Sequence, residues 1–388
     1  MKQTYPTYSR SVIVVSVVTA AMLLGPMALV PAGSKVWLKA SAQVPEVGAA
    51  KPANADPAQA DPAQAVTNPL SGKEITPELQ RAVERGLEFL ASRQDATGKI
   101  SSFESADTGI TALAGIAFLA SGNTPGRGKY GGEVQKCIDF LVAGAQESGL
   151  LGGQAQHGVM YSHGFATLFL AEVYGMTGDD RVREVLVRAV RLIESSQNRE
   201  GGWRYQPLPL DADVSVTICQ VMALRAARDA GIKIDKGVID RAIAYVKKCQ
   251  NEDGGFSYML GGGSSLFPRS AAGVATLFYA GIYSGPEVDS GLKYLARYTP
   301  GKADGADAES TAHYYYGQYY AVQTMFLAGG THWSSWFPAI REELLAKQQP
   351  GGSWTGESSE EYCTAMALIV LQIPYRFLPV FSGKGPGS

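Results

Sequence analysis

The chain has 388 residues, 45 % of them hydrophobic, and a formal net charge of −2 at pH 7. Its 34 basic residues are scattered among 36 acidic ones without a clustered stripe of lysine and arginine, which excludes the charge pattern of a nucleic-acid-binding protein. The apolar content is enough for a large buried core, so we expect a sizeable folded domain with no nucleic-acid partner.

The N-terminal residues 1–42 are typical of an export signal. Two basic residues precede an apolar run at 11–30, and Ala-Ser-Ala at 40–42 offers a small-x-small site for a signal peptidase. The run also reaches the roughly 20 residues that a membrane span needs, so retention as an N-terminal anchor is the alternative. We expect an exported chain, periplasmic, in the cell envelope or secreted, with membrane attachment through this segment left open.

Residues 43–75 are rich in alanine and proline and contain the pentapeptide ADPAQ at 55–59 and again at 60–64. This composition has few large apolar side chains to bury, so it predicts a disordered linker. The last residues, 381–388, are predicted to form a flexible tail. Between the two lies the candidate folded domain, residues 76–380.

A glutamine followed by a glycine-rich turn and an aromatic residue recurs along this domain. Clear copies are QNREGGW, QNEDGGF and QQPGGSW, and weaker ones are QDATGKI and QESGLLGG; these copies begin at Gln94, Gln146, Gln197, Gln250 and Gln348. The glutamines are 52, 51, 53 and 98 residues apart. Because the last gap is nearly two periods, a degenerate copy is expected near Tyr298, which makes six units.

Each unit combines two kinds of predicted helix. An amphipathic helix precedes the glutamine, as at 181–197 and 238–250, and a more uniformly apolar helix follows the glycines, as at 108–122, 164–178 and 362–374. A helix that is apolar all round is buried all round. Six half-exposed helices around six buried ones, with the sixth unit closing on the first, predict an all-α fold, an (α/α)6 toroid.

The glutamine, glycine and aromatic pattern resembles the repeat of squalene and oxidosqualene cyclases and of the protein prenyltransferase β-subunits. The resemblance implies the (α/α)6 barrel of that family, in which the glutamine ties the end of an outer helix to the following helix start. It also implies that an apolar, isoprenoid-like ligand is bound or transformed in the barrel. Squalene–hopene cyclases carry a DxDD motif with a proton-donating aspartate, which maps here onto Asp211-Ala212-Asp213-Val214, with Asp213 as the candidate acid and the fourth position lost.

The mouth of the barrel is expected where the buried helices begin. Aligning these helices on a shared threonine, with Tyr319 in the fifth unit, uses Thr111, Thr167, Thr217, Thr276 and Thr364. The polar residues that then fall four positions upstream are Asp107, His163, Asp213, Tyr315 and Glu360. Such residues could form an acid/base or metal site. The alternative is that the acids cap helix N-termini and take no part in chemistry.

The densest aromatic patch runs from 312 to 320, and its candidate ligand-contacting residues are His313, Tyr315, Tyr316 and Tyr319. Their rings would line the apolar site and stabilise a cation through their faces, or would be large core residues. Arg269, which precedes another buried helix, is a candidate for binding a carboxylate or phosphate group.

We expect no metal and no cofactor. The resemblance to prenyltransferases would imply zinc on an Asp-x-Cys pair and a later histidine, but the nearest match, Glu361-Tyr362-Cys363, has the wrong acid and only earlier histidines. The four cysteines fit no CxxC pattern and are expected to be buried. Two further functions stay open beside the cyclase-like or transferase-like one: a non-catalytic interaction module of the envelope, and a carbohydrate-active (α/α)6 enzyme.

Overall fold

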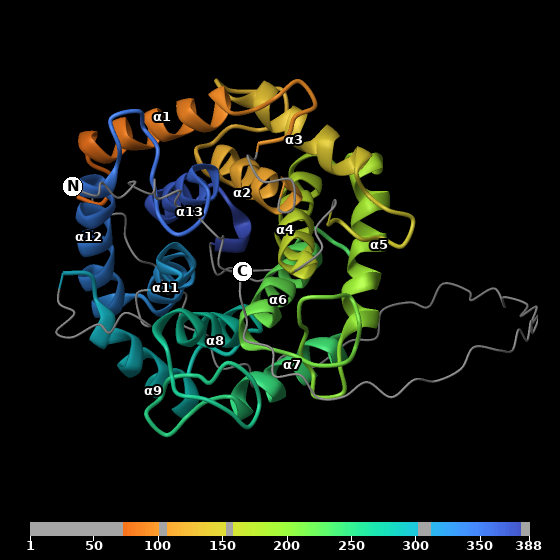
Figure 1. The fold of residues 1–388 in the computed structure, drawn as a ribbon, viewed down its shortest axis with the longest axis vertical. Coiled ribbons are helices and arrows are strands. Elements are labelled where there is room, and N and C mark those ends of the chain that lie inside the picture. Colours follow the sequence, from red (N-terminus) through yellow and green to blue (C-terminus); the bar gives the residue numbers. More distant parts are fainter. Residues whose placement is uncertain (1–72, 101–106, 153–157, 302–311, 382–388) are drawn as a thin grey trace, which may run out of the picture. The chain divides into compact units, whose positions relative to one another are not determined.

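The computed structural model describes residues 73–100, 107–152, 158–301 and 312–381, which all belong to one unit spanning residues 65–388. The expected signal segment, nearly all of the linker and the tail after residue 381 lie outside the described residues. Figure 1 shows the described helices of this unit as an outer ring around an inner ring.

The outer ring holds the six amphipathic helices found in the described residues. These are α1 (Pro77–Ser92), α3 (Gly131–Ala143), α5 (Asp180–Ser196), α7 (Lys236–Lys248), α9 (Pro286–Leu295) and α12 (Gly330–Lys347). In α5 the core face is made by Val182, Leu186 and Ile193, which are all fully buried. The spacing of 4 and 7 residues keeps these side chains on one side of the helix, as the sequence pattern predicted.

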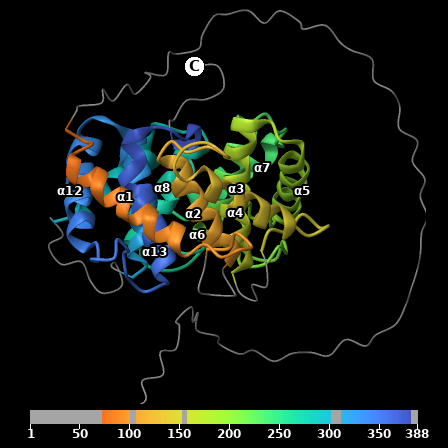
Figure 2. The ribbon, with the colours of Figure 1, turned by 90° about the horizontal axis from the view of Figure 1, so that it is seen from above.

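The inner ring holds the more uniformly apolar helices. These are α2 (Asp107–Ala120), α4 (Val159–Thr177), α6 (Val214–Asp229), α8 (Phe267–Tyr279), α11 (Tyr314–Ala328) and α13 (Glu360–Gln372). Each packs against the next, and α13 packs against α2, where the Gln372 side-chain amide donates to the Ala117 carbonyl at 3.1 Å. The described residues contain no strand, and the predicted all-α (α/α)6 toroid is confirmed. Figure 2 shows the helices from the side, with α1 lying across α13.

The repeated glutamines join neighbouring outer helices. Gln197 Nε2 donates to Gly201 O and to Val238 O in α7, both at 2.8 Å. Gly201 has φ 105°, and a Cβ at that position would lie 2.2 Å from the carbonyl oxygen of Arg241, so the turn requires glycine. The glutamine therefore bridges to the next outer helix, whereas the resemblance implied a tie to the helix that follows in the chain.

The last glutamine closes the ring in the same way. Gln348 Nε2 donates to Gly352 O at 2.9 Å and to Ala82 O in α1 at 2.8 Å. The same two-way bond thus joins the sixth unit to the first. The unit without a glutamine ends in the short helix η1 (Ala296–Tyr298), at the place predicted for the degenerate copy.

A second repeated hydrogen bond fixes five of the six inner helices beneath their turns in the described residues. A backbone N–H at or near the end of the motif donates to a polar side chain near the helix start, and the five pairs are Ile100 with Thr111, Leu151 with His163, Trp203 with Thr217, Phe256 with Ser270 and Trp354 with Thr364. His163 and Ser270 therefore occupy the place that the alignment gave to Thr167 and Thr276. That alignment was wrong by four and six residues because a hydroxyl or an imidazole nitrogen can accept this bond, so the position does not require threonine.

The last described segment, residues 373–381, crosses the other side of the inner ring, where the inner helices end. The segment runs through η2 (Ile373–Tyr375) and η3 (Pro379–Phe381), and η3 packs against α6. Its Leu378, Val380 and Phe381 side chains are buried. Within residues 73–100, 107–152, 158–301 and 312–381, no helix combines the length and apolarity needed to cross a membrane.

Candidate functional site

Asp213 is a fully buried carboxyl group at the start of α6. Its backbone is extended, with φ −136°, and its N–H donates to Trp203 O at 2.9 Å, so the chain returns to the repeated turn before the helix begins. Oδ1 accepts the Val216 N–H at 2.7 Å, which makes Asp213 the N-cap. Oδ2 accepts the Tyr258 hydroxyl at 3.2 Å and lies 3.8 Å from Arg204 Nε.

Burial raises the pKa of Asp213 to about 7, against the opposing effects of the Val216 N–H, the Arg204 charge and the Tyr258 hydroxyl. The cap bond and the macrodipole of α6 favour the ionised form, but desolvation outweighs them. At neutral pH the group is therefore poised between acid and base. Since Oδ1 is held by the backbone, Oδ2 is the oxygen that carries the proton.

Five partly exposed tyrosines surround this end of the inner ring, and we call them the tyrosine mouth: Tyr161, Tyr205, Tyr258, Tyr316 and Tyr362. Three of them stand at the third residue of α4, α11 and α13, and two come from the turns that precede α6 and α8. The rings of Tyr161 and Tyr205 are 6.2 Å apart, and the hydroxyls of Tyr205 and Tyr258 are hydrogen bonded. Tyr316 donates to Ser215 O at 3.0 Å, which links α11 to α6.

The rings of the tyrosine mouth are largely buried. Burial is the largest cause that raises the pKa of Tyr161, Tyr258, Tyr316 and Tyr362 well above the ordinary value, with Asp213 adding to it for the first three. The side chains nevertheless keep some contact with solvent. Phenols that are desolvated but still accessible stay uncharged, as contact with an apolar ligand requires.

Arg204 connects the mouth to the turn before α6. Its guanidinium lies 5.1 Å from the Tyr205 ring centre and 5.8 Å from that of Tyr258. It also forms an ion pair with Asp211. The corresponding position of two other clear copies holds Ser257 and Thr355. An arginine in one copy only was therefore a signal that sequence reasoning missed.

The structure buries none of the other predicted acids whose side chains it describes. Asp211 is exposed and reaches the site through Arg204. Glu360 is exposed and lies 3.7 Å from Arg93 at the end of α1, while Ser359 caps α13. Asp107 is the first residue of α2, and its side chain is outside the described part of the structure.

His163 lies beneath a turn and not on the mouth, which corrects its predicted place beside Asp213. It is fully buried; Nδ1 accepts the Leu151 N–H at 3.1 Å and Nε2 lies 3.2 Å from Ala189 O in α5. With one ring nitrogen accepting, the other donates, and the ring is neutral. Burial lowers the pKa of His163 to about 4, opposed by the Ala189 bond.

The predicted ligand-contacting residues of the fifth unit point in different directions. Tyr315 donates to Thr355 O at 3.0 Å, and His313 is exposed with Nδ1 3.6 Å from Glu357. Tyr319 is fully buried, with its ring 6.0 Å from Phe165. Tyr316 alone of this set belongs to the tyrosine mouth. The half-buried Arg269 stands at the third residue of α8 and donates to Ser264 O.

The described residues hold no group of three histidine, cysteine, aspartate or glutamate side chains placed to bind a metal ion. All four cysteines are buried and unpaired as thiols. Cys219 belongs to the site's surroundings, since its Sγ lies 3.2 Å from the Tyr320 hydroxyl below the mouth. Burial raises the pKa of Cys219 to about 12, so this thiol stays protonated.

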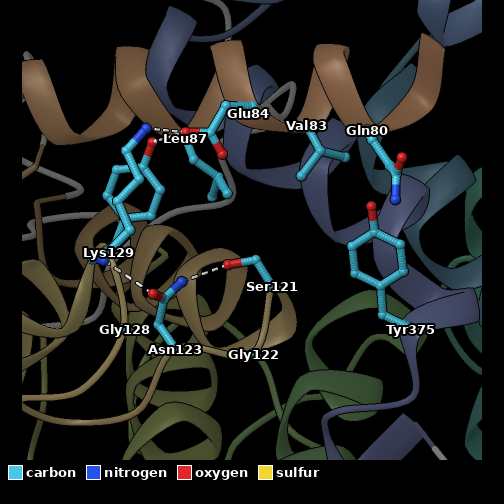
Figure 3. Close-up of a pocket in the computed structure, with 11 residues that line it drawn as sticks. Gln80, Val83, Glu84, Leu87, Ser121, Gly122, Asn123, Gly128, Lys129 and Tyr375 are labelled. Carbon is cyan, nitrogen blue, oxygen red and sulfur yellow. Dashed lines mark hydrogen bonds and ion pairs between the residues drawn. The ribbon is translucent and has the colours of Figure 1, made fainter. Parts of the chain in front are cut away.

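A separate cavity of about 430 Å³ lies between α1 and the turn at 121–130 (Figure 3). Its apolar side is formed by Val83 and Leu87, and Gln80 faces Tyr375 at one end. At the other end Glu84 is paired with Lys129 and accepts the Tyr130 hydroxyl at 2.9 Å. Because its charged groups already satisfy one another, this cavity is a weaker candidate than the mouth around Asp213.

The ring of six helix pairs, with the buried Asp213 and the tyrosine mouth at the start of the inner helices, defines the chain as an α/α toroid. Residues 112–305 match the prenyltransferase alpha-alpha toroid domain, and the chain belongs to this family. The resemblance read from the repeats is thereby confirmed. No curated protein matches the sequence.

Several solved structures share the fold. A variant of the type II terpene cyclase MstE from Scytonema, in complex with geranylgeranyl dihydroxybenzoate, is 14% identical over 78% of this chain and 98% of that chain, with a TM-score of 0.55. A protein from Actinoplanes is 17% identical over 76% and 99%, with a TM-score of 0.53. The α-1,6-mannanase from Salegentibacter sp. HEL1_6 is 10% identical over 77% and 99%, with a TM-score of 0.57.

Proposed function

We propose that this toroid binds an apolar, isoprenoid-like ligand at the tyrosine mouth and that Asp213 is the acid that acts on it. The observation that carries the proposal is a fully buried carboxyl group, with its pKa raised to about 7, set among phenols that remain uncharged. A carboxyl group perturbed in this way among partly exposed side chains is typical of acid/base catalysis. The aromatic rings supply apolar contact and can stabilise positive charge on a ligand.

The pKa of Asp213 limits the kinds of reaction that this group can catalyse. A general acid or base works best when its pKa lies near the working pH, as that of Asp213 does. The first and third acidic positions of the DxDD pattern are present, but Val214 stands at the fourth. We therefore propose proton transfer to or from an oxygen or an activated carbon of the ligand, not protonation of an unactivated alkene.

Two further functions share the fold, and the site favours neither. Glycoside hydrolysis needs two carboxyl groups on either side of the scissile bond, and Asp211, the neighbouring acid in the chain, is exposed and paired with Arg204. A non-catalytic envelope module does not explain why this carboxyl group is surrounded by partly exposed phenols and a guanidinium. The terpene cyclase that shares the fold was solved with a geranylgeranyl compound bound, which supports the isoprenoid class for this chain.

The proposal is tested by mass spectrometry of lipids that copurify with the full-length chain, followed by turnover of the lipid class identified. Asp213→Asn keeps the cap bond and removes the proton, so turnover should fall by about 100-fold or more while binding remains. The matched control is Glu172→Gln, a buried carboxyl group far from the mouth, which should leave turnover unchanged. Full activity of Asp213→Asn would remove Asp213 from the chemistry, and absence of any bound isoprenoid would favour the envelope module.

We also propose that the chain acts outside the cytoplasm, on the basis of its N-terminal sequence. The sequence predicts cleavage after residue 42, so the mature protein should begin at Gln43. N-terminal sequencing of the protein recovered from its natural host distinguishes the two predicted states. A mature chain that still contains residues 11–30 would establish the anchored form instead.

A further inference from the structure

The loops between the repeated turns and the inner helices differ in length. Measured between the two residues of the repeated hydrogen bond, they span 10 residues in the sixth unit, 11 and 12 in the first and second, and 14 in the third and fourth. The same anchor is thus reached with 10 residues, so the additional residues of the third unit are not needed for the fold. They belong to the loop at 204–212, which we call the mouth loop.

The mouth loop is fixed at its base and apolar at its tip. At the base, Arg204 pairs with Asp211, and Tyr205 O accepts the Met160 N–H at 3.1 Å. At the tip, the side chains of Leu208 and Leu210 are 53% and 78% exposed. Large apolar side chains with this exposure lose favourable burial energy unless something covers them.

The tip can tilt without breaking its own structure. Leu208 N–H donates to Gln206 O at 2.7 Å and Leu210 N–H to Leu208 O at 2.9 Å, so these bonds stay within the loop. Pro207 and Pro209 have no N–H to satisfy and restrict the backbone between the leucines. The tip is therefore expected to move as one rigid apolar unit while the base of the loop stays in place.

We propose that the mouth loop is a lid whose two leucines close over the apolar ligand at the tyrosine mouth. The Arg204–Asp211 ion pair holds the base of the loop in place while the tip moves. Tyr205 belongs both to the loop and to the mouth, so closure of the tip brings Leu208 and Leu210 toward the rings that contact the ligand. The inference rests on the proposed function, since the lid has no purpose without an apolar ligand. It assigns a specificity role to residues outside the acid site.

Equilibrium dialysis of the full-length chain with radiolabelled farnesol tests the lid. Leu208→Ser with Leu210→Ser should weaken binding by about tenfold or more, because the apolar area that the ligand covers is lost. Leu260→Ser is the matched control, since Leu260 is an exposed leucine (38%) on the neighbouring loop, whose carbonyl at Tyr258 accepts the Val214 N–H. It should bind farnesol within about twofold of the wild type.

Hydrogen exchange supplies a second readout that does not depend on the variants. The amides of 205–212 should become protected when farnesol is added to the wild type, more than those of 257–266. If the wild type binds farnesol but the double variant binds it equally and the mouth loop gains no protection, the lid is rejected and the proposed function stands. If the wild type binds no farnesol, or if Tyr316→Ala binds it as tightly as the wild type does, both proposals fail.

Discussion

Three carboxyl groups are buried in the described part of the toroid. Glu361 pairs with Arg93, and the other two, Asp213 and Glu172, lie at opposite ends of the inner ring. Asp213 starts α6 at the mouth, whereas Glu172 lies near the end of α4, beneath the C-terminal segment. Glu172 Oε1 accepts the Val380 N–H at 3.3 Å, and Oε2 has no hydrogen-bond partner among the described residues. Burial raises the pKa of Glu172 to about 8, with Asp229 adding to it.

The difference lies in what surrounds the two groups. The positive end of the α6 macrodipole, a phenol and a guanidinium face Asp213, all of which keep an ionised state within reach. Glu172 stands toward the negative end of α4, beside another acid, under the buried side chains of Leu378 and Val380. A raised pKa alone therefore does not mark a catalytic acid. A catalytic acid also needs access to a ligand and hydrogen-bond partners for both of its protonation states.

The largest expected effect is on how the stability of the Asp213 and Glu172 variants, relative to the wild type, depends on pH. Asp213→Asn and Glu172→Gln should each become more stable relative to the wild type by up to about 4 kcal/mol as the pH rises, since each wild-type pKa is about three units above its ordinary value. The native acid holds its proton longer than the unfolded chain, so wild-type stability falls with rising pH. For Asp213 this fall runs from about pH 4 to 7, and for Glu172 from about 4.5 to 8.

Urea unfolding at pH 4, 6, 8 and 9 measures these differences. Turnover then completes the comparison, because only the Asp213 variant should lose activity. Flat pH profiles for the difference between wild type and variant would show that the carboxyl groups are hydrated in solution. Loss of turnover in Glu172→Gln would contradict the assignment of the far end as structural.

A smaller effect is expected from opening the closed end. Leu378 is 1% exposed, and Leu378→Ala should cost about 2 to 4 kcal/mol because a large buried side chain is lost and a cavity remains. Water admitted by the loosened segment should also lower the pKa of Glu172 toward its ordinary value. Urea unfolding gives the first quantity, and carboxyl ¹³C chemical shifts give the second. An equal pKa shift at Asp213 would show that the environments of the two carboxyl groups are coupled and not independent.

The fold could be predicted from the sequence because its determinants are local and repeated. Gln197 and Gly201 bond within one turn and to the next outer helix, and the same geometry recurs at Gln348 and Gly352. The difference between half-exposed and uniformly apolar helices then assigns each helix to a ring. Periodicity alone therefore determined the number, order and ring of the helices.

The site was only partly predictable, because its residues come from different units. Asp213 followed from the resemblance, and Tyr316 from the aromatic patch. Tyr161, Tyr258 and Tyr362 stand in separate units, and only the closed ring brings their rings to one mouth. The spacing of these tyrosines in the sequence does not predict that they lie close together in the fold. The predicted site roles of Asp107 and Glu360 stay predictions, and the role of Asp211 is linked to that of Arg204.

The smallest effect concerns His163, which sequence alignment placed beside Asp213 and the structure places in a repeated anchor. Thr217 fills the same position with a bond of 3.1 Å to Trp203 N, so His163→Thr should retain the Leu151 bond. It should cost about 2 kcal/mol at pH 7 for the lost ring volume and the lost bond to Ala189 O. Ligand binding at the mouth should be unchanged.

The pH dependence of that cost is the sharper measurement. The pKa of His163 is lowered to about 4, so the unfolded chain takes up a proton first, and wild-type stability falls as the pH drops from about 6.5 to 4, opposite to the trend for Asp213. His163→Thr lacks this loss, and in urea unfolding at pH 4.5 it should equal or exceed the wild type. If the variant is less stable at every pH and also binds ligand more weakly, His163 contributes to the ligand site at the mouth. A variant that differs from the wild type only through this crossover leaves Asp213, among the described residues, as the buried group of the mouth with a pKa near neutrality.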